Sequence, residues 1–286
     1  MTAFVELCAG MVGVSMRVAH RNILLKYRGS KHRLAPDIID VGVIKRPSRF
    51  IWAEANPHAR RFLQTFSDPK VSAGAVKIIQ SWVDEGPHAV KGRWVELAKL
   101  FDAKSFRSLD VSDEEHCASF FLWRQIEGFQ RRPNIHLLGL ALAEGAQRNK
   151  QIKRHDWMVY QARAAAKNFS GMKATIYDDA ALVKPFKNAV VYLDPPYAGT
   201  RGYSQFDMTR SQVVEIAKDW DRAGAQVIVS EGSPVEELVL EGWHTCQISD
   251  RSGFQPGVFS PEHLTTNRVP YGELGRGGIT TLFTEE

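Results

Sequence analysis

The chain has few cysteines, no long apolar run and no obvious targeting segment, and each absence narrows what it can be. Its three cysteines, Cys8, Cys117 and Cys246, are widely separated and include no Cys-x-x-Cys pair. This pattern disfavours a disulfide framework and a zinc site, and it fits a reducing compartment. No apolar run reaches the length of a membrane span, and the N-terminus lacks a basic region followed by an apolar signal core. We therefore expect a cytoplasmic protein without a membrane partner.

Two further kinds of site are missing from the sequence. No glycine-rich loop with Gly-Lys-Ser or Gly-Lys-Thr is present, so a phosphate loop is not expected. Several histidines show neither a metal-ligand spacing nor a cysteine or serine partner, namely His58, His116, His136, His155 and His263. We therefore expect no metal.

The composition describes a globular protein with a mild excess of positive charge. Hydrophobic residues make up 44% and charged residues 24% of the chain. Its 286 residues suffice for one large domain, or for one domain with a sizeable insertion. The net charge of +5 permits a polyanionic partner but does not require one.

The most informative stretch is Asp194-Pro195-Pro196-Tyr197, which ends the apolar run 189–193. The two prolines fix φ and lack N–H donors, so the chain leaves the strand stiffly and its carbonyl groups stay available as acceptors. An acid and an aromatic ring are thereby held at the carboxyl end of a strand, where open α/β sheets bind ligands. The combination suits a planar heterocycle with an exocyclic amino group. An ordinary strand followed by a Pro-Pro turn is the alternative.

This tetrapeptide resembles the catalytic motif of amino-methyltransferases that use S-adenosylmethionine, especially the Dam-like DNA adenine-N6 methyltransferases. Thr200 and Tyr203 follow it, as a threonine and a tyrosine often do in that family. The resemblance implies a site-specific DNA-methyltransferase (adenine-specific) that flips its target base out of double-stranded DNA. It also implies a bacterial or phage-infected cell, with restriction–modification and phage protection both open. It assigns catalysis to Asp194, Pro195, Pro196 and Tyr197.

A second part of the resemblance lies at the start of the chain. Residues 4–10 form an expected buried strand that runs into a glycine, and residues 11–19 form the start of an expected helix. Strand, turn and helix are similar to the family's first motif, an acid-x-Phe-x-Gly-x-Gly pattern. Val12 departs from it, because it stands near the position where a second glycine is common; a plain strand–helix turn is the alternative. The cofactor contacts implied here are Glu6, Cys8, Ala9, Gly10 and Gly13.

Two later expected strands also end in acids. Residues 50–53 lead into Glu54, and a carboxylate at this point of such a sheet can accept from both hydroxyl groups of a ribose. A surface glutamate on a turn is the alternative. Residues 174–177 lead into an acidic pair, where the family's third motif has an acid that meets the adenine of the cofactor. Asp179 is the better candidate of that pair. The implied contacts are Glu54, Ala55, Asp178, Asp179 and Ala180.

The segment from Tyr27 to Lys31 is similar to the family's aromatic-x-Gly-x-Lys motif. The resemblance implies that both residues contact the cofactor, with Lys31 near the carboxylate of its methionine part. A helix expected to begin near Ser30 adds N–H donors for the same anion. In the family this motif usually precedes the glycine turn, whereas here it follows it. A basic solvated loop is the alternative.

The expected strands predict an α/β fold. Further strands are expected at 225–230, 243–248 and 278–283, the last two antiparallel because they partly alternate. With helices between them, the seven strands resemble the Rossmann-like methyltransferase sheet, which is mostly parallel with one reversed strand.

The stretch 68–169 holds no clear strand and has far too many residues for a simple crossover. We therefore expect a helical inserted subdomain, which corresponds by position to the family's target-recognition region. Its segment 119–124 is similar to a Phe-Tyr-x-x-Arg element of that region, although the tyrosine is missing. The remaining residues, 1–67 and 170–286, form the expected catalytic domain that binds S-adenosylmethionine.

The end of the insertion is strongly basic. Between residues 148 and 173, seven lysines and arginines accompany a single acid, Asp156. A helix with this bias, carrying Trp157 and Tyr160, can follow a phosphate backbone, although a solvated face is the usual alternative. The polar, glycine-rich segment 250–277 is an expected loop between the last two strands, long enough to reach a substrate; a mobile loop without such a contact is the alternative. The nucleic-acid contacts implied are Arg124, Lys150, Lys153, Arg154, Thr200, Tyr203 and Arg251.

We therefore predict a DNA adenine-N6 methyltransferase with S-adenosylmethionine as methyl donor and S-adenosylhomocysteine as product. No feature indicates an oligomeric state. Cytosine-N4 methylation is one alternative, disfavoured because Ser-Pro-Pro-Tyr is more usual there, and RNA adenine methylation is another. A third is a non-catalytic nucleic-acid-binding module on the same fold. The complete Asp-Pro-Pro-Tyr motif disfavours that module, whereas Val12 and the displaced Lys31 motif favour it.

Overall fold

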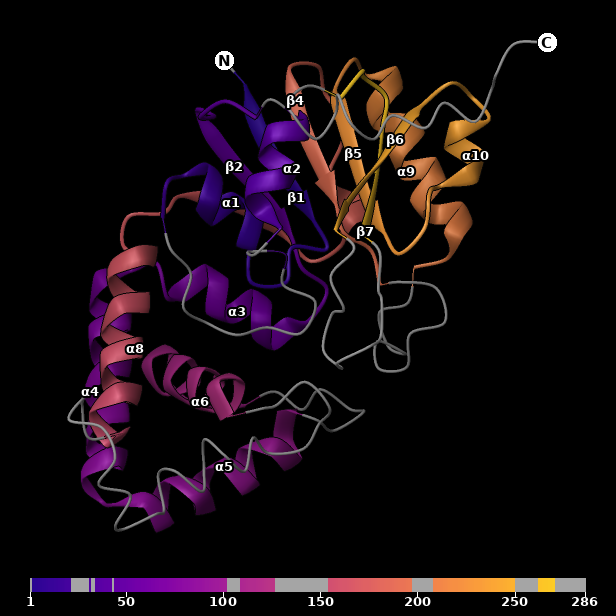
Figure 1. Ribbon diagram of the computed structural model, residues 1–286. Coiled ribbons are helices and arrows are strands. Elements are labelled where there is room, and N and C mark those ends of the chain that lie inside the picture. The colour runs from indigo at the N-terminus through magenta and orange to yellow at the C-terminus, as the bar shows by residue number, and fades with distance from the viewer. Residues whose placement is uncertain are drawn as a thin grey trace. The chain divides into compact units, whose positions relative to one another are not determined.

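The computed structural model describes residues 2–21, 31, 34–42, 44–101, 109–126, 154–196, 208–249 and 262–270. They form an α/β protein (Figure 1). The strands are β1 (Ala3–Leu7), β2 (Arg49–Ala53), β3 (Ala174–Tyr177), β4 (Ala189–Leu193), β5 (Gln226–Glu231), β6 (His244–Ser249) and β7 (Glu262–Thr266). The helices are α1 (Gly13–Val18), α2 (Ala35–Gly42), α3 (Pro57–Thr65), α4 (Pro69–Asp84), α5 (Pro87–Phe101), α6 (Asp113–Ile126), α8 (Arg154–Phe169), the 3-10 helix η1 (Ala180–Leu182), α9 (Arg210–Arg222) and α10 (Glu236–Val239).

In the described residues, one sheet of seven strands has the order β3-β2-β1-β4-β5-β7-β6. Neighbouring strands from β3 to β5 are parallel, and β7 runs antiparallel to both β5 and β6. The prediction of an α/β fold with a mostly parallel sheet is therefore confirmed, but the strand that is reversed among those described, β7, was not predicted. The first five positions follow the order of doubly wound nucleotide-binding sheets, and the insertion of β7 between β5 and β6 departs from it.

Alternate residues of the strands bury the two faces of this sheet. Val5 and Val191 belong to a buried cluster with side chains of α9 and α10. Phe4 and Val190 face the other way, into a cluster with α1 and α2. Every residue of β1 and β4 is buried, as expected for parallel strands with helices on both sides. The sheet is thus the middle of three layers (Figure 1).

The reversed strand β7 lies where the sequence predicts a loop, within 250–277. Leu264 is its one large apolar residue, so hydrophobicity gave no signal for a strand. Thr265 and Thr266 are nevertheless buried, and β-branched side chains suit a strand. The strand predicted at 278–283 lies outside the described residues.

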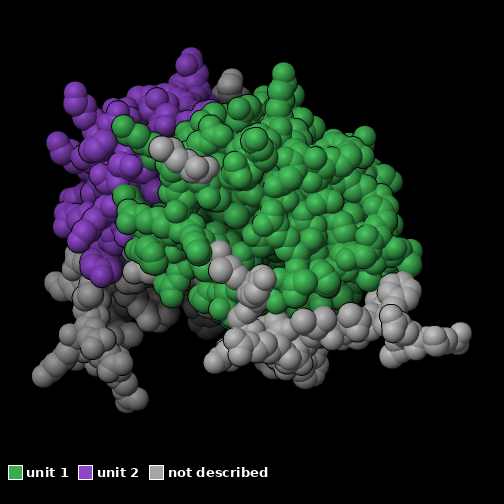
Figure 2. Space-filling view, turned by 90° about the horizontal axis from the view of Figure 1, so that it is seen from above, with its two compact units in different colours: residues 1–21, 29–56, 173–286 green, residues 22–28, 57–172 purple. Residues whose placement is uncertain are grey.

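The chain divides into two compact units (Figure 2), one of residues 1–21, 29–56 and 173–286 and the other of residues 22–28 and 57–172. The first unit contains the whole sheet. The described elements of the second unit are all helices, with α4 packed against α6 and α8. Within the described residues, 68–169 is therefore helical as predicted, and α3 belongs with it. None of the described helices is both long and apolar enough for a membrane crossing.

Asn267 joins the end of β7 to the start of β5. Its Oδ1 accepts the Val227 N–H at 2.9 Å, and its Nδ2 donates to the Ala225 carbonyl at 2.9 Å. We expect Asn267→Ala to lower the free energy of unfolding by about 1–3 kcal/mol, because backbone groups of β5 lose their partner. The exposed neighbour Arg268→Ala is the matched control and should change it by less than about 0.5 kcal/mol. Equal effects of the two variants in chemical denaturation would contradict this role.

Candidate functional site

The ends of four parallel strands bring the predicted acids to one edge of the sheet. In the strand register, Leu7 pairs with both Ala53 and Leu193. Ala53 in turn pairs with Tyr177. The residues that directly follow these aligned ends are Cys8, Glu54, Asp194 and Asp178. Positions far apart in the sequence therefore meet at the edge where ligands bind to such sheets.

Cys8 shows how closely these acids approach one another. Burial raises the pKa of its thiol well above the usual range. The negative charges of Glu54, Asp194 and Asp179 raise it further. Carboxylates that follow three different strands thus act on one sulfur at the end of β1, and that sulfur stays a neutral thiol.

Glu6 holds the turn that follows β1. Its buried carboxylate accepts the backbone N–H of Ser15 at 2.8 Å and that of Val14 at 3.3 Å. The residue before α1, Val12, offers no side-chain cap, so Glu6 satisfies the first donors of the helix from the preceding strand. Burial raises the pKa of Glu6 to about 7 despite these hydrogen bonds. The hydrogen bonds of Glu6 therefore shape this turn. A direct contact of Glu6 with the cofactor stays a prediction.

Three residues of this turn adopt the left-handed conformation, Cys8 with φ 58°, Gly10 with φ 50° and Val12 with φ 48°. Glycine enters this region readily, whereas a β-branched residue seldom does. The chain therefore departs from the family's glycine pattern by holding Val12 in a conformation that favours glycine, with its side chain fully buried. Strain of this kind costs about 1–3 kcal/mol and is concentrated at functional sites.

The acids after β2 and β3 differ in exposure. Glu54 is buried, and its Oε1 accepts the Asn56 N–H at 2.8 Å. Asp179 is exposed and begins η1 by accepting the Ala181 N–H at 2.8 Å. A hollow lies beside Asp179, lined by residues of η1 and of α9. Glu54, predicted to bind the ribose, and Asp179, predicted to bind the adenine, therefore follow adjacent strands. The hollow lies next to Asp179.

Asp194 is paired with Lys31 in a small, largely buried network. Lys31 Nζ lies 3.4 Å from Asp194 Oδ1 and 3.1 Å from Glu262 Oε1. The hydroxyl of Ser230 donates to Glu262 as well. The Asp194 side chain is 16% exposed. The predicted acceptor for an amino group is thus partly accessible, and a cation already contacts it.

Burial and neighbouring charges set the ionisation of this pair. Burial raises the pKa of Asp194 to about 7, with Lys31 opposing that rise and Glu262 and Glu231 adding to it. For Lys31, burial lowers the pKa, but the two carboxylates outweigh burial and the net direction is upward. Near neutral pH Asp194 therefore stands between its two forms, while Lys31 carries its charge.

Lys31 lies at this edge, although its motif follows the glycine turn in the sequence. The helix α2 begins at Ala35, so the predicted start near Ser30 is wrong and Lys31 precedes the helix. Its ammonium contacts two carboxylates of the protein, and a contact with the carboxylate of a cofactor stays a prediction. Tyr27, the other residue of this motif, lies outside the described residues.

Three residues of this edge were not predicted as site residues: Ser230 and Glu231 at the end of β5, and Glu262 at the start of β7. Arg210 at the start of α9 neutralises Glu231, with Nη1 3.3 Å from its Oε1. An acid after a buried strand was the signal that found Glu54, and the same signal fits Glu231. No such signal exists for Glu262, because the order of the sheet alone brings β7 beside β5.

In the helical unit, Arg124 is buried and its guanidinium carbon lies 4.6 Å from the centre of the Trp123 ring. The side chain is buried in this unit, and its contact with nucleic acid stays a prediction. Tyr160, Arg163 and Lys167 of α8 are exposed at helical spacing and share one face. Of Arg154 only the backbone is described, at the start of α8. Other predicted contacts lie outside the described residues, namely Lys150, Lys153, Tyr197, Thr200, Tyr203 and Arg251.

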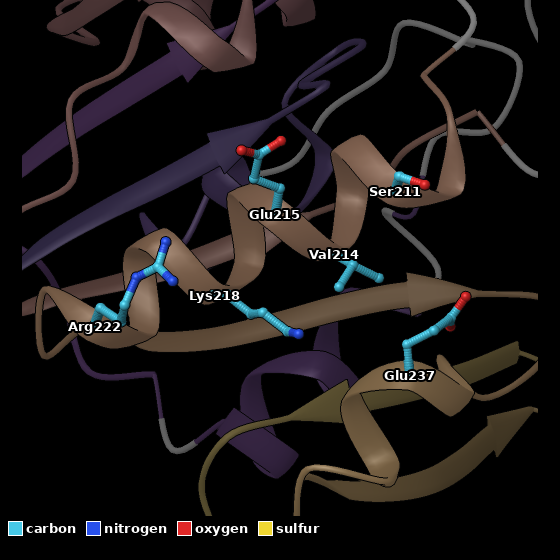
Figure 3. Close-up of a pocket in the computed structure, with 6 residues that line it drawn as sticks. All are labelled: Ser211, Val214, Glu215, Lys218, Arg222 and Glu237. Atoms are coloured by element: carbon cyan, nitrogen blue, oxygen red, sulfur yellow. The ribbon is translucent and has the colours of Figure 1, made fainter.

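A second hollow lies along α9 (Figure 3). Five α9 residues and Glu237 of α10 line it, and none of the predicted site residues is among them. Its charges are mixed, with Lys218 and Arg222 beside Glu215 and Glu237. This hollow therefore does not favour a ligand whose charges are all positive or all negative. In the described part of the chain, no group of three or more His, Cys, Asp or Glu side chains is arranged to hold a metal ion.

The buried carboxyl of Glu6 predicts a dependence of stability on pH. Its pKa of about 7 in the folded protein exceeds the ordinary 4.5, so between these values the folded state holds a proton that the unfolded chain has released. Stability should therefore fall by about 3 kcal/mol as pH rises from 4.5 to 7, on account of this group. Glu6→Gln should flatten that slope in denaturation experiments. The exposed Glu215→Gln is the control, and an unchanged slope in Glu6→Gln would refute the assignment.

Comparison with models of known protein families finds no match to this chain. Comparison with curated protein sequences finds no match either. The functional argument therefore rests on the residues at the carboxyl edge of the sheet and on their contacts.

Proposed function

We propose that the chain is an S-adenosylmethionine-dependent methyltransferase that acts on the N6 amino group of adenine in DNA. The observation that carries the proposal is the position of Asp194 beside the turn after β1. Leu7 and Leu193 pair in register, and the Asp194 N–H donates to the Leu7 carbonyl at 3.3 Å. An acceptor for an amino group therefore adjoins a turn of the kind that binds nucleotides, and transfer between two substrates needs such proximity.

The topology of the sheet supports this proposal. Among the described strands, β7 is the one that runs antiparallel to the others, and both of its neighbours are antiparallel to it. A mostly parallel sheet with one reversed strand is what the resemblance to methyltransferases led us to expect.

The residues at this edge also fit S-adenosylmethionine in their chemistry. Glu54 follows β2, where a carboxylate can accept from ribose hydroxyl groups. Asp179 follows β3 and borders a hollow, in a position suited to the adenine of the cofactor. The turn at residues 8–12 holds Gly10 in the left-handed conformation, and glycine allows backbone to approach a ligand closely. When bound, the cofactor supplies an electrophilic methyl group on its sulfonium.

The amino group of adenine is a poor nucleophile, because its nitrogen lone pair is delocalised into the ring. The Asp194 carboxylate and the Pro195 carbonyl would each accept one N–H bond, which favours a pyramidal nitrogen with its lone pair directed out of the base plane. Pro195 has no N–H and a fixed φ, so this carbonyl leaves the strand in a defined direction. Stacking of the base on Tyr197 would add about 1–3 kcal/mol, against a flipping cost of a few kcal/mol.

The protein's main contribution is then positioning. Holding two reactants in line removes about 7–11 kcal/mol of barrier. After transfer the nitrogen carries one proton too many, and Asp194, whose pKa is raised to about 7, can take it. A strong base is not required, because that proton is far more acidic than one on the unmethylated amine.

A non-catalytic nucleic-acid-binding module on the same fold is the second candidate. The ion pair between Lys31 and Asp194 favours it, because a cation already contacts the proposed acceptor. Cytosine-N4 and RNA adenine methylation would use the same acceptor and differ from the proposal in their product.

The product separates these functions. The protein should be incubated with radiolabelled S-adenosylmethionine and either DNA or RNA, and the polymer should then be digested to nucleosides. The proposal predicts label in N6-methyladenine from DNA. Label on cytosine, or in RNA alone, would identify the other enzymes. Measurable cofactor binding without label on any polymer would identify the module.

Asp194→Ala should abolish methyl transfer, or lower kcat by at least about 10²–10³, the usual cost of losing one hydrogen-bond partner of a transition state. Cofactor affinity measured by calorimetry should stay close to the wild-type value, because the amine contact is not part of that site. Asp110→Ala removes an exposed acid of the helical unit and is the control. Near-normal turnover in Asp194→Ala would reject the assignment.

The exposed basic face of α8 predicts a salt-dependent contact with the phosphate backbone. Double charge reversal of Arg163→Glu and Lys167→Glu should weaken DNA binding at low salt. It should also make the slope of log Kd against log salt shallower by about 2, close to 0.9 per lost phosphate contact. Lys184→Glu, an exposed lysine of the other unit, is the control. A salt slope identical to the wild type in fluorescence anisotropy would reject this surface.

A further inference from the structure

Glu262 lies closer to the Lys31 ammonium than Asp194 does. Lys31 Nζ lies 3.1 Å from Glu262 Oε1 and 3.2 Å from its Oε2, whereas its distance to Asp194 Oδ1 is 3.4 Å. The cation is therefore shared between two carboxylates, and Glu262 presents both oxygens to it. Such two-oxygen contacts fix a charged group more firmly than a single one.

Glu262 is itself held in place. It begins β7 and is 7% exposed, and the Ser230 hydroxyl donates to its Oε1. The next residue, His263, pairs with Glu231 in the β5–β7 register, so the backbone at this point belongs to the sheet. An acid on a buried strand, bonded to a second strand, is a rigid anchor.

We propose that Glu262 is a positioning residue for methyl transfer to the amino group: fixed by Ser230, it anchors the Lys31 ammonium beside Asp194. This inference rests on the proposed function. An exocyclic amine that bonds to Asp194 then displaces one contact of Lys31, while the contacts with Glu262 hold the cation nearby.

The charges around Asp194 show what the anchored cation contributes. Glu262 and Glu231 are negative neighbours of Asp194 that raise its pKa, and Arg210 pairs with Glu231. Lys31 is the cation that contacts Asp194 itself. On the side of β1, Asp194 also acts on Glu6. Without Lys31, the remaining negative charges would drive Asp194 towards its protonated form.

Protonation would change what Asp194 can bind. An ionised carboxylate only accepts hydrogen bonds, whereas a carboxylic acid uses one oxygen as a donor. An amine that must give its N–H groups to Asp194 therefore needs the ionised form. Anchoring Lys31 keeps that form available near neutral pH, where burial alone would remove it.

Carboxyl titration by carbon-13 NMR tests the anchor directly, with Asp194→Asn used to assign the signal of Asp194. Lys31→Met should raise the pKa of Asp194 by about 1–3 pH units, because an adjacent opposite charge is lost. Glu262→Gln should raise it as well, because Lys31 loses the carboxylate that holds it beside Asp194; loss of the negative charge of Glu262 alone, with Lys31 still in place, would lower it. Ser230→Ala, which frees Glu262 to turn away, should raise it less.

Glu262→Gln should also lower kcat for methyl transfer at neutral pH with little change in cofactor affinity, and it should move the acid limb of the pH profile to higher pH. Glu241→Gln removes an exposed acid that pairs with Lys218 and is the control. Lys31→Arg keeps a cation and checks that effects of Lys31→Met are electrostatic rather than a loss of folding. An Asp194 pKa that does not change in Glu262→Gln, or that falls, overturns the inference, because Lys31 then stays beside Asp194 without Glu262. Absence of methyl transfer by the wild type, with the titration as expected, would instead contradict the proposed function alone.

Discussion

Carboxylates buried at the carboxyl ends of parallel strands need partners, and this need organises the candidate site. A buried charge without a partner is too costly to retain, so each acid is met by a donor from another segment. Backbone N–H groups of α1 satisfy Glu6, Lys31 contacts Asp194, and Arg210 pairs with Glu231. These contacts involve the turn after β1, Lys31 and the start of α9. The charges that make the edge chemically useful thus also determine its shape.

Burial at this edge also shifts the pKa values of two acids far from their ordinary range. Desolvation raises the pKa of both Glu6 and Asp194 to about 7. For Glu6 this costs stability at neutral pH in exchange for a capped helix and a fixed turn. For Asp194 it places the carboxyl near the pH at which a group can both accept hydrogen bonds and take up a proton. The strained conformation of Val12 is a further cost at the same turn.

The sequence predicts the strands whose residues are apolar and whose ends are marked by an acid or a glycine. β1, β2, β3 and β4 lie where predicted, because buried parallel strands appear as short continuous apolar runs. It does not predict β7, whose buried threonines resemble a polar loop. Since Glu262 stands on that strand, the partner of Lys31 could not be found either. Motif spacing gave the residues at the edge, whereas their pairing depends on the order of strands and on which side chains are desolvated together.

The central claim is that Asp194 receives an exocyclic amino group at the edge of the sheet. A crystal structure of the protein with S-adenosylhomocysteine and an adenine-containing DNA duplex tests it most directly. The account predicts a flipped adenine with its N6 within about 2.7–3.2 Å of Asp194 Oδ1 or Oδ2, and Lys31 retained on Glu262. A structure in which DNA and cofactor are bound while Asp194 remains closed on Lys31, with every base stacked in the duplex, would contradict it.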